Sequence, residues 1–314
     1  VSGTASGSGF ICRLKTDGSP DETFGSGFAP GCPTFGKPLV EVKSFKIQAD
    51  GKIVVLGTPQ DQGALAVRRL LANGVVDDAF ANPNFKPSAI APNGGTGRDL
   101  AIAPDGVIIV AGLALTADQV SQAFVMRLTS VGAIDSSFGK LGVAYTQFAP
   151  STKSDAWSVR TLSDGSILVS GRAEVGPFAS PAWGVAKLTP KGKLDGVTFA
   201  GSGRQMHFVC DVCISTFNNG MTVQSDGRIV LAGWAALDGV TPLMTLMRLK
   251  SNGTIDESFG ALGTQFVPIS MNDEEARAIA TSVAIQNGRI VAAGTAWTEA
   301  DPGNSDIVVV RLQN

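Results

Sequence analysis

Five short hydrophobic runs, each introduced by a tight turn, recur along the chain. Each run begins with Asp-Gly or Asn-Gly, continues through β-branched and other apolar residues, and ends at a glycine: Asp50–Gly57, Asp105–Gly112, Asp164–Gly171, Asp226–Gly233 and Asn287–Gly294. The closing glycines lie 55, 59, 62 and 61 residues apart. A near-constant period of this length is typical of an array of small repeated sheets.

The third repeat shows how one period divides into strands, which we call A to D in chain order. Residues 156–162 alternate between apolar and polar and predict strand A. Asp164-Gly165 then predicts a hairpin turn, because this pair tolerates the positive φ angles of tight turns. Residues 167–171 predict an apolar strand B, and residues 183–188 and 204–208 predict strands C and D.

The repeated pattern predicts an all-β fold, a five-bladed β-propeller of four-stranded antiparallel blades in one domain, residues 1–314. Solenoids are the alternative, although their repeats are generally shorter. The chain ends on a C-like strand, residues 307–312, so we expect the closure segment, residues 1–36, to lend its D-like part, residues 28–35, to the last blade. The C-like piece Phe10–Leu14 then has no predicted place; it is either a remnant of a sixth repeat or an outer strand.

A second motif follows each strand C: a basic residue and Leu, a turn with Gly, an Asp eight residues after the basic residue, and a Phe three or four residues later. We interpret the constant offset as a structural ion pair, with the Asp also accepting N–H groups of its own turn and the Phe filling the gap between blades. Five identical acid sites are the less favoured interpretation. The pairs are Arg13 and Asp21, Arg69 and Asp77, Arg127 and Asp135, Lys187 and Asp195, Arg248 and Asp256; the rings are Phe24, Phe80, Phe138, Phe199 and Phe259.

The two motifs together resemble a known family. Arg13–Gly25 reads Arg-Leu-Lys-Thr-Asp-Gly-Ser-Pro-Asp-Glu-Thr-Phe-Gly, and Asp50–Gly57 reads Asp-Gly-Lys-Ile-Val-Val-Leu-Gly. This combination is similar to the delta-60 repeat family of bacterial β-propeller proteins, and the resemblance covers nearly the whole chain. It implies an extracellular or envelope protein, and it supplies no catalytic residues.

Composition narrows the class of protein. The chain has 25 basic and 27 acidic residues and no basic stretch, which argues against nucleic acid as a partner. No segment reaches the roughly 18 apolar residues of a membrane span. Four cysteines allow two disulfides, and we favour Cys12–Cys32 and Cys210–Cys213 because each pair lies within one repeat; four buried thiols are the alternative. Disulfides would favour an extracellular or periplasmic location.

The sequence offers little catalytic chemistry and indicates no cofactor and no metal site. The single histidine, His207, excludes a multi-histidine metal site, and we favour a surface or hydrogen-bonded role for it. Asp99 and Asp155 begin neighbouring inner strands and could flank a sugar bond at a central channel, as paired acids of glycosidases do. Pairing with nearby basic residues is the favoured alternative for both acids.

Variable loops point to a binding surface. The B–C and D–A loops differ in length between repeats, and binding residues usually lie in such loops on a rigid scaffold. We expect this face to meet a protein or a glycan through Phe178, Trp183, Trp234, Trp297, Asp155, Asp273, Glu274 and Glu275. The leading hypothesis is a secreted, non-catalytic binding or scaffold module. The alternatives are a glycan-active hydrolase or lyase and a structural subunit of a bacterial envelope or extracellular assembly.

Overall fold

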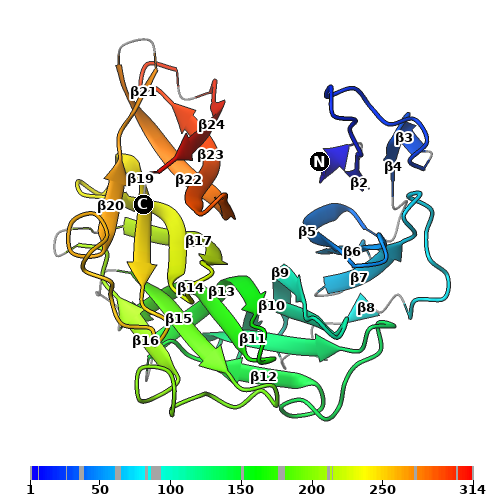
Figure 1. The fold of residues 1–314 in the computed structure, drawn as a ribbon, viewed down its shortest axis with the longest axis horizontal. Helices are drawn as coiled ribbons and strands as arrows, with labels where there is room; N and C mark the ends of the chain where they lie inside the picture. Colours follow the sequence, from blue (N-terminus) through cyan, green and yellow to red (C-terminus); the bar gives the residue numbers. More distant parts are fainter. Residues whose placement is uncertain are drawn as a thin grey trace. The chain divides into compact units, whose positions relative to one another are not determined.

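The computed structural model describes residues 2–5, 7–25, 27–34, 39–60, 65–81, 84–85, 93–149, 152–175, 181–210, 213, 215–271, 274–301 and 303–312. These residues form strands and turns, with no helix among them. The strands can be followed by label and colour in Figure 1.

Five sheets of four antiparallel strands dominate the described chain, which confirms the predicted five-bladed β-propeller. The first four sheets follow chain order, A to D from one edge to the other. Their strands are β5 (Glu41–Ile47), β6 (Ile53–Thr58), β7 (Leu65–Leu70) and β8 (Asn84–Phe85); β9 (Gly95–Ile102), β10 (Ile108–Leu115), β11 (Ser121–Leu128) and β12 (Val143–Thr146); β13 (Thr152–Thr161), β14 (Ile167–Val175), β15 (Ala182–Leu188) and β16 (Arg204–His207); β17 (Ser215–Val223), β18 (Ile229–Ala236), β19 (Pro242–Leu249) and β20 (Thr264–Val267).

The chain divides into two compact units, each described here by itself. The first comprises residues 1–145, 161–165 and 190–192, and the second comprises residues 146–160, 166–189 and 193–314. In the first unit, apolar side chains of β6, β7, β10 and β11 form a core between the first two sheets, with Phe124 and Leu56 fully buried. In the second unit, an equivalent core joins the fourth and fifth sheets and includes Leu246 and Ile290.

The fifth sheet has a different composition from the one expected. It consists of β21 (Ile269–Met271), β22 (Glu274–Gln286), β23 (Arg289–Trp297) and β24 (Asp306–Arg311), in that order. The fourth strand of this sheet is β21, which pairs with the first residues of the long strand β22. Strand β24 lies at the opposite edge of the sheet. The strand expected from residues 28–35 would pair with β24, at the opposite edge of the sheet from β21, so closure by the N-terminal segment stays a prediction.

The N-terminal segment forms its own hairpins. β1 (Ser2–Ala5) pairs with β2 (Ser8–Ile11), and β3 (Gly27–Ala29) pairs with β4 (Cys32–Pro33). Phe10 of β2 also forms a bridge with Thr34, so the D-like segment is engaged with the piece Phe10–Leu14 whose place the sequence left open. Both predicted disulfides are confirmed: Cys12–Cys32 joins β4 to the residue after β2, and Cys210–Cys213 lies after β16.

The closing glycine of each repeat is explained by a bulge in strand A. The register of strand A slips by one residue opposite or next to this glycine in the first, second, fourth and fifth sheets. The bulge brings a strand A carbonyl so close that a Cβ on Gly171 would overlap the oxygen of Asp155, and one on Gly233 would overlap that of Phe217. Only glycine leaves room for this approach.

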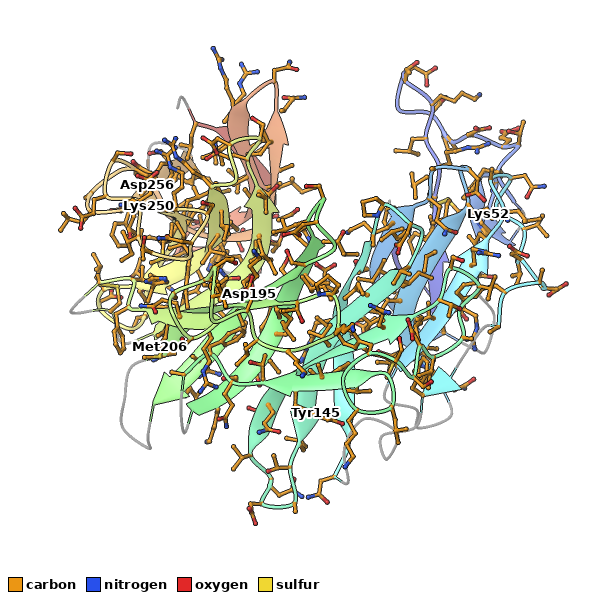
Figure 2. All side chains as sticks on the ribbon, turned by 60° about the horizontal axis from the view of Figure 1, so that its bottom comes forward. Lys52, Tyr145, Asp195, Met206, Lys250 and Asp256 are labelled. Carbon is orange, nitrogen blue, oxygen red and sulfur yellow. A yellow bond between two sulfur atoms is a disulfide. The ribbon has the colours of Figure 1, made fainter. Side chains whose placement is uncertain are left out.

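The C–D turns repeat one set of contacts. The Arg Nε donates to Asp Oδ2 over 2.8 Å in the pairs of Arg13, Arg69, Arg127 and Arg248, and Lys187 Nζ lies 3.2 Å from Asp195. In the four arginine repeats the guanidinium carbon lies 4.6, 4.7, 5.3 and 4.7 Å from the centroid of the Phe ring. Figure 2 labels two of the five aspartates, Asp195 and Asp256.

Each of these turns is joined to the next repeat. Phe199 packs on Gly253 of the following turn, where a Cβ would overlap the ring, and Ala200 N donates to Asn252 O over 2.9 Å. The first three repeats make the same two contacts through Phe24, Phe80 and Phe138. The motif is therefore structural, as predicted: the ion pair shapes the turn, and the ring fills the gap between neighbouring sheets.

Candidate functional site

Three half-buried aromatic rings meet between the third and fourth sheets, within the second unit. Phe217 of β17 lies edge-on to Trp157 of β13, with ring centroids 4.8 Å apart. Phe217 also lies parallel to Trp234 of β18, with centroids 6.3 Å apart. We call Trp157, Phe217 and Trp234 the aromatic cluster. Rings that are partly buried yet retain an exposed face can hold a ligand without being mobile themselves.

The repeat places these residues where the loops begin. Trp234 follows the closing glycine Gly233, and Phe217 is its partner on the neighbouring strand. In the third sheet the corresponding positions hold Asp155, whose carbonyl approaches Gly171, and Arg172, which follows that glycine. The same two backbone positions therefore carry two aromatic rings in the fourth sheet and two charged side chains in the third.

Charged groups border the aromatic cluster on the side of the third sheet. The Arg172 guanidinium carbon lies 5.6 Å from the centroid of Phe217, within the range of a cation–π contact. Arg172 Nη2 also pairs with Glu174, and Lys153 Nζ lies 3.8 Å from the same carboxylate. The Phe217 ring and the Glu174 carboxylate both contact the Arg172 guanidinium, so Arg172 forms one side of the aromatic cluster.

Four buried polar atoms next to the cluster have no hydrogen-bond partner among the described residues: Asp155 Oδ1, Arg172 Nε, Trp183 Nε1 and Asn218 Nδ2. Arg172 lies opposite Trp183 in the β14–β15 ladder, and Asn218 follows Phe217 directly. Asn218 Oδ1 accepts a hydrogen bond of 3.2 Å from Ser170 Oγ, which ties the fourth sheet to the third at this point. Buried polar atoms of folded proteins are satisfied by water or by a ligand when no side chain does so.

The structure places the predicted binding residues in different surroundings. Trp234 lies in the aromatic cluster, and Asp155 lies two residues before Trp157 on β13. Trp183 is fully buried, so it offers no exposed ring to a ligand, in contrast to its expected place on the binding surface. Trp297, half-buried, lies opposite Arg277 in the fifth sheet, and Glu274 and Glu275 are exposed in the β21–β22 hairpin. Phe178 and Asp273 lie outside the described residues.

The two candidate catalytic acids lie in different units. In the first unit, Asp99 Oδ1 accepts from Ser44 Oγ over 2.7 Å and lies 3.8 Å from Lys46 Nζ, so this carboxylate is paired with strand A of the preceding sheet. In the second unit, Asp155 is half-buried on β13, two residues before Trp157. Their expected role as a catalytic pair stays a prediction.

His207 has a structural environment. It is buried, and its Nε2 lies 3.0 Å from the carbonyl oxygen of Gly253 in the next repeat. Burial lowers the pKa of His207 below 6.5, although the backbone contact opposes this. The neutral imidazole therefore links the third sheet to the turn of the fourth.

Two searches covered the described part of the chain, one for metal-binding groups and one for membrane-spanning helices. Its His, Cys, Asp and Glu side chains form no group of three that could hold a metal ion. Among the same residues, no helix is long and apolar enough to cross a membrane.

Trp157, Phe217 and Arg172 were missed by reasoning from the sequence. The signal that could have found them is their repeat position, because Arg172 and Trp234 each follow a closing glycine. Trp157 and Phe217 lie in strands whose bulge shifts the alternation of buried and exposed positions, which conceals them from a simple period of two.

One family model matches four separate segments of the chain. The family model described as "Domain of unknown function (DUF5122) beta-propeller" matches residues 1–24, 48–80, 103–138 and 224–259. A search of curated proteins finds no match.

Among solved structures, the chain is similar to a protein of unknown function from Dyadobacter fermentans, with TM-score 0.54, 11% identity, and coverage of 90% of this chain and 79% of that one. It is also similar to a glucose dehydrogenase, with TM-score 0.50, 11% identity and coverage of 96% and 90%. A third similar structure is hydrazine synthase of Kuenenia stuttgartiensis, with TM-score 0.49 and 11% identity; 89% of this chain spans 38% of that protein. At these identities the likeness concerns the fold alone.

Proposed function

We propose that the chain is a non-catalytic β-propeller module that binds a glycan through the aromatic cluster between its third and fourth sheets. The observation that carries the proposal is the meeting of Trp157, Phe217 and Trp234, half-buried and edged by a fixed cation. Sugar rings present C–H faces that pack on aromatic rings, and few other neutral polar ligands combine such a face with many hydroxyl groups.

The unpartnered polar atoms support a polyhydroxylated ligand. Trp183 Nε1, Asn218 Nδ2 and Arg172 Nε are donors, whereas Asp155 Oδ1 is an acceptor. A hydroxyl group both donates and accepts, so adjacent sugar hydroxyls, directly or through the water that they hold, suit this mixed set. With one carboxylate, Asp155, and one guanidinium, Arg172, the set carries no net charge, which favours a neutral glycan.

Two disulfides support an oxidising environment, and we place the protein in the extracellular space or the periplasm. The alternatives, a glycan-active enzyme using Asp99 and Asp155 and a subunit of an envelope assembly, have no specific observation in their favour. They serve as outcomes of the experiment below.

A glycan array followed by titration calorimetry tests the proposal. Trp157→Ala should weaken binding at least about tenfold, because loss of one stacking ring removes on the order of 1–3 kcal/mol. Trp297→Ala is the matched control, since it removes a half-buried Trp of the fifth sheet and should leave binding unchanged.

Three results would contradict the proposal. The array could show no neutral glycan bound by the wild-type chain, or the two Trp variants could lose binding equally. Cleavage of a bound glycan in the same samples would favour the hydrolase, and loss of that cleavage in Asp155→Asn would assign it to this acid.

A further inference from the structure

Donors outnumber acceptors among the four buried polar atoms next to the aromatic cluster. Trp183 Nε1, Asn218 Nδ2 and Arg172 Nε each have a proton to donate, whereas Asp155 Oδ1 accepts. Two of these donors are the least accessible, because Trp183 and Asn218 are both 0% exposed. A ligand group that satisfies them must therefore accept more hydrogen bonds than it donates, and it must reach below the surface.

The donors lie on neighbouring strands of the second unit. Arg172 and Trp183 are opposite each other in the β14–β15 ladder, so their side chains lie on the same face of the third sheet. Strand β17, which carries Phe217 and Asn218, lies against both β14 and β15. Asn218 contacts Ser170, two residues before Arg172, and Phe217 contacts Arg172 itself. The donors and the aromatic cluster therefore belong to one interface between the third and fourth sheets.

The charged side chains around these donors balance one another. Arg172 pairs with Glu174, and Lys153 Nζ lies 3.8 Å from the same carboxylate. Together with Asp155 the set has two basic and two acidic groups, so its net charge is zero. A carboxylate or sulfate group of a ligand would meet no uncompensated cation here, and burying such an anion is costly. The acceptor that the donors require is therefore a neutral group.

An amide carbonyl is the neutral group that fits a surplus of buried donors. Its oxygen accepts two hydrogen bonds and brings no proton of its own. A sugar hydroxyl also accepts two, yet its proton would need a buried acceptor, and a buried donor without a partner is unfavourable. Glycans carry amides as acetamido groups, which project further from the sugar ring than a hydroxyl does. The acetamido N–H supplies the one donor that Asp155 Oδ1 can take.

We propose that the aromatic cluster binds a glycan containing an N-acetylated amino sugar, and that the buried donors recognise its acetamido group. This inference rests on the proposed glycan-binding function and specifies the class of ligand. The sugar ring packs on Trp157, Phe217 and Trp234, while the acetamido carbonyl accepts from Trp183 Nε1 and Asn218 Nδ2. The rings thus provide affinity for a sugar, and the donors provide the choice among sugars.

Pairs of sugars that differ in this substituent test the inference by titration calorimetry with the full chain. Tri-N-acetylchitotriose and cellotriose share their linkage and differ in having an acetamido group or a hydroxyl at the second carbon of each sugar. Methyl N-acetylgalactosaminide and methyl galactoside form a second pair. In at least one pair the acetamido sugar should bind about tenfold or more tightly, because the hydroxyl sugar leaves buried donors without an acceptor.

Variants separate recognition of the acetamido group from stacking. Trp183→Phe removes the Nε1 donor and keeps an apolar ring, so it should bring the ratio of the two affinities toward unity. Asn218→Asp replaces the Nδ2 donor, keeps the oxygen that accepts from Ser170, and should change the ratio in the same direction. Trp157→Ala is the matched control, since it should weaken both sugars alike and leave the ratio unchanged. A general loss of structure would also lower both affinities together.

The outcomes distinguish this inference from the function on which it rests. Equal binding within both pairs, tighter binding of the hydroxyl sugars, or an unchanged ratio in both Trp183→Phe and Asn218→Asp would overturn the inference and leave glycan binding standing. The same holds if the array shows only glycans that lack an acetamido group and neither acetamido probe binds. If no neutral glycan binds at all, both the inference and the proposed function fall.

Discussion

The two ends of the sheets differ in how they use the same repeat. At the C–D turns, equivalent positions carry equivalent residues, and each Arg or Lys forms an ion pair with the Asp of its own turn. At the loop end of the third and fourth sheets, equivalent positions carry Asp155 and Arg172 in one sheet and Phe217 and Trp234 in the next. The Asp of the turn motif is paired with its Arg, whereas Asp155 Oδ1 and Arg172 Nε at the loop end have no hydrogen-bond partner among the described residues.

The difference indicates at which positions of a repeat protein a functional site is to be expected. A contact that recurs in every repeat answers a need that every repeat has, which is to pack on its neighbour. A position whose backbone is constant and whose side chain varies is free of that need. The aromatic cluster lies at such positions, and the Arg–Asp–Phe motif does not.

Removal of a turn ring should have the largest effect on stability. Phe138 is fully buried and packs on Gly192 of the next turn. Phe138→Ala should lower the free energy of unfolding by about 3–5 kcal/mol through lost burial and the cavity left behind. Urea denaturation measures this, with Phe208→Ala as the control because that ring is 51% exposed. Equal losses in both variants would show that the turn rings are not special.

Loss of a turn carboxylate should have a smaller effect that depends on burial. Asp256→Asn removes the charge opposite Arg248, both side chains being 7% exposed, and should cost about 1–3 kcal/mol. Asp21→Asn breaks the same contact where the side chains are 41% and 20% exposed, and should lower the free energy of unfolding less than Asp256→Asn does. Thermal unfolding of the two variants compares them directly. A larger loss for Asp21→Asn would contradict the structural role assigned to the buried pair.

The smallest expected effect is that of acidification on stability, which should separate the turn carboxylates from His207. The Ser258 hydroxyl, and then Arg248, hold the pKa of Asp256 below 3.8 against the opposing effect of burial; the Ser137 hydroxyl and Arg127 act likewise on the pKa of Asp135. A folded-state pKa below the unfolded value gives stability that is present above the unfolded pKa and lost as pH falls through the folded one. Protonation of these carboxylates should therefore lower the free energy of unfolding only below about pH 4.

His207 should act at a higher pH. Its folded pKa is lowered by burial, so the unfolded chain takes up a proton first as pH falls below about 6.5, and stability declines from there. Unfolding midpoints measured between pH 8 and pH 3 should show a shallow decline below pH 6.5 and a steeper one below pH 4. In His207→Gln the shallow decline should vanish; its persistence would assign it to another group.

The sequence alone was enough to predict the repeat, the strand order of the first four sheets and the structural role of the turn motif. These follow from local chemistry: Asp-Gly fixes a tight turn, alternation fixes a strand, and a constant offset of eight fixes Arg and Asp on one turn. Both disulfides could be chosen for the same reason, since each joins cysteines of one repeat. Trp234 could be placed because it follows a closing glycine.

Only the tertiary structure decided the rest. The cluster of Trp157, Phe217 and Trp234 joins strands of two different repeats, and a contact between repeats leaves no mark in a hydrophobic pattern. Trp183 appears in the sequence as a candidate surface ring, yet tertiary packing buries it fully. Phe10–Leu14 found its place through Gly3 and Thr34, because pairing is a relation between segments that no single segment contains.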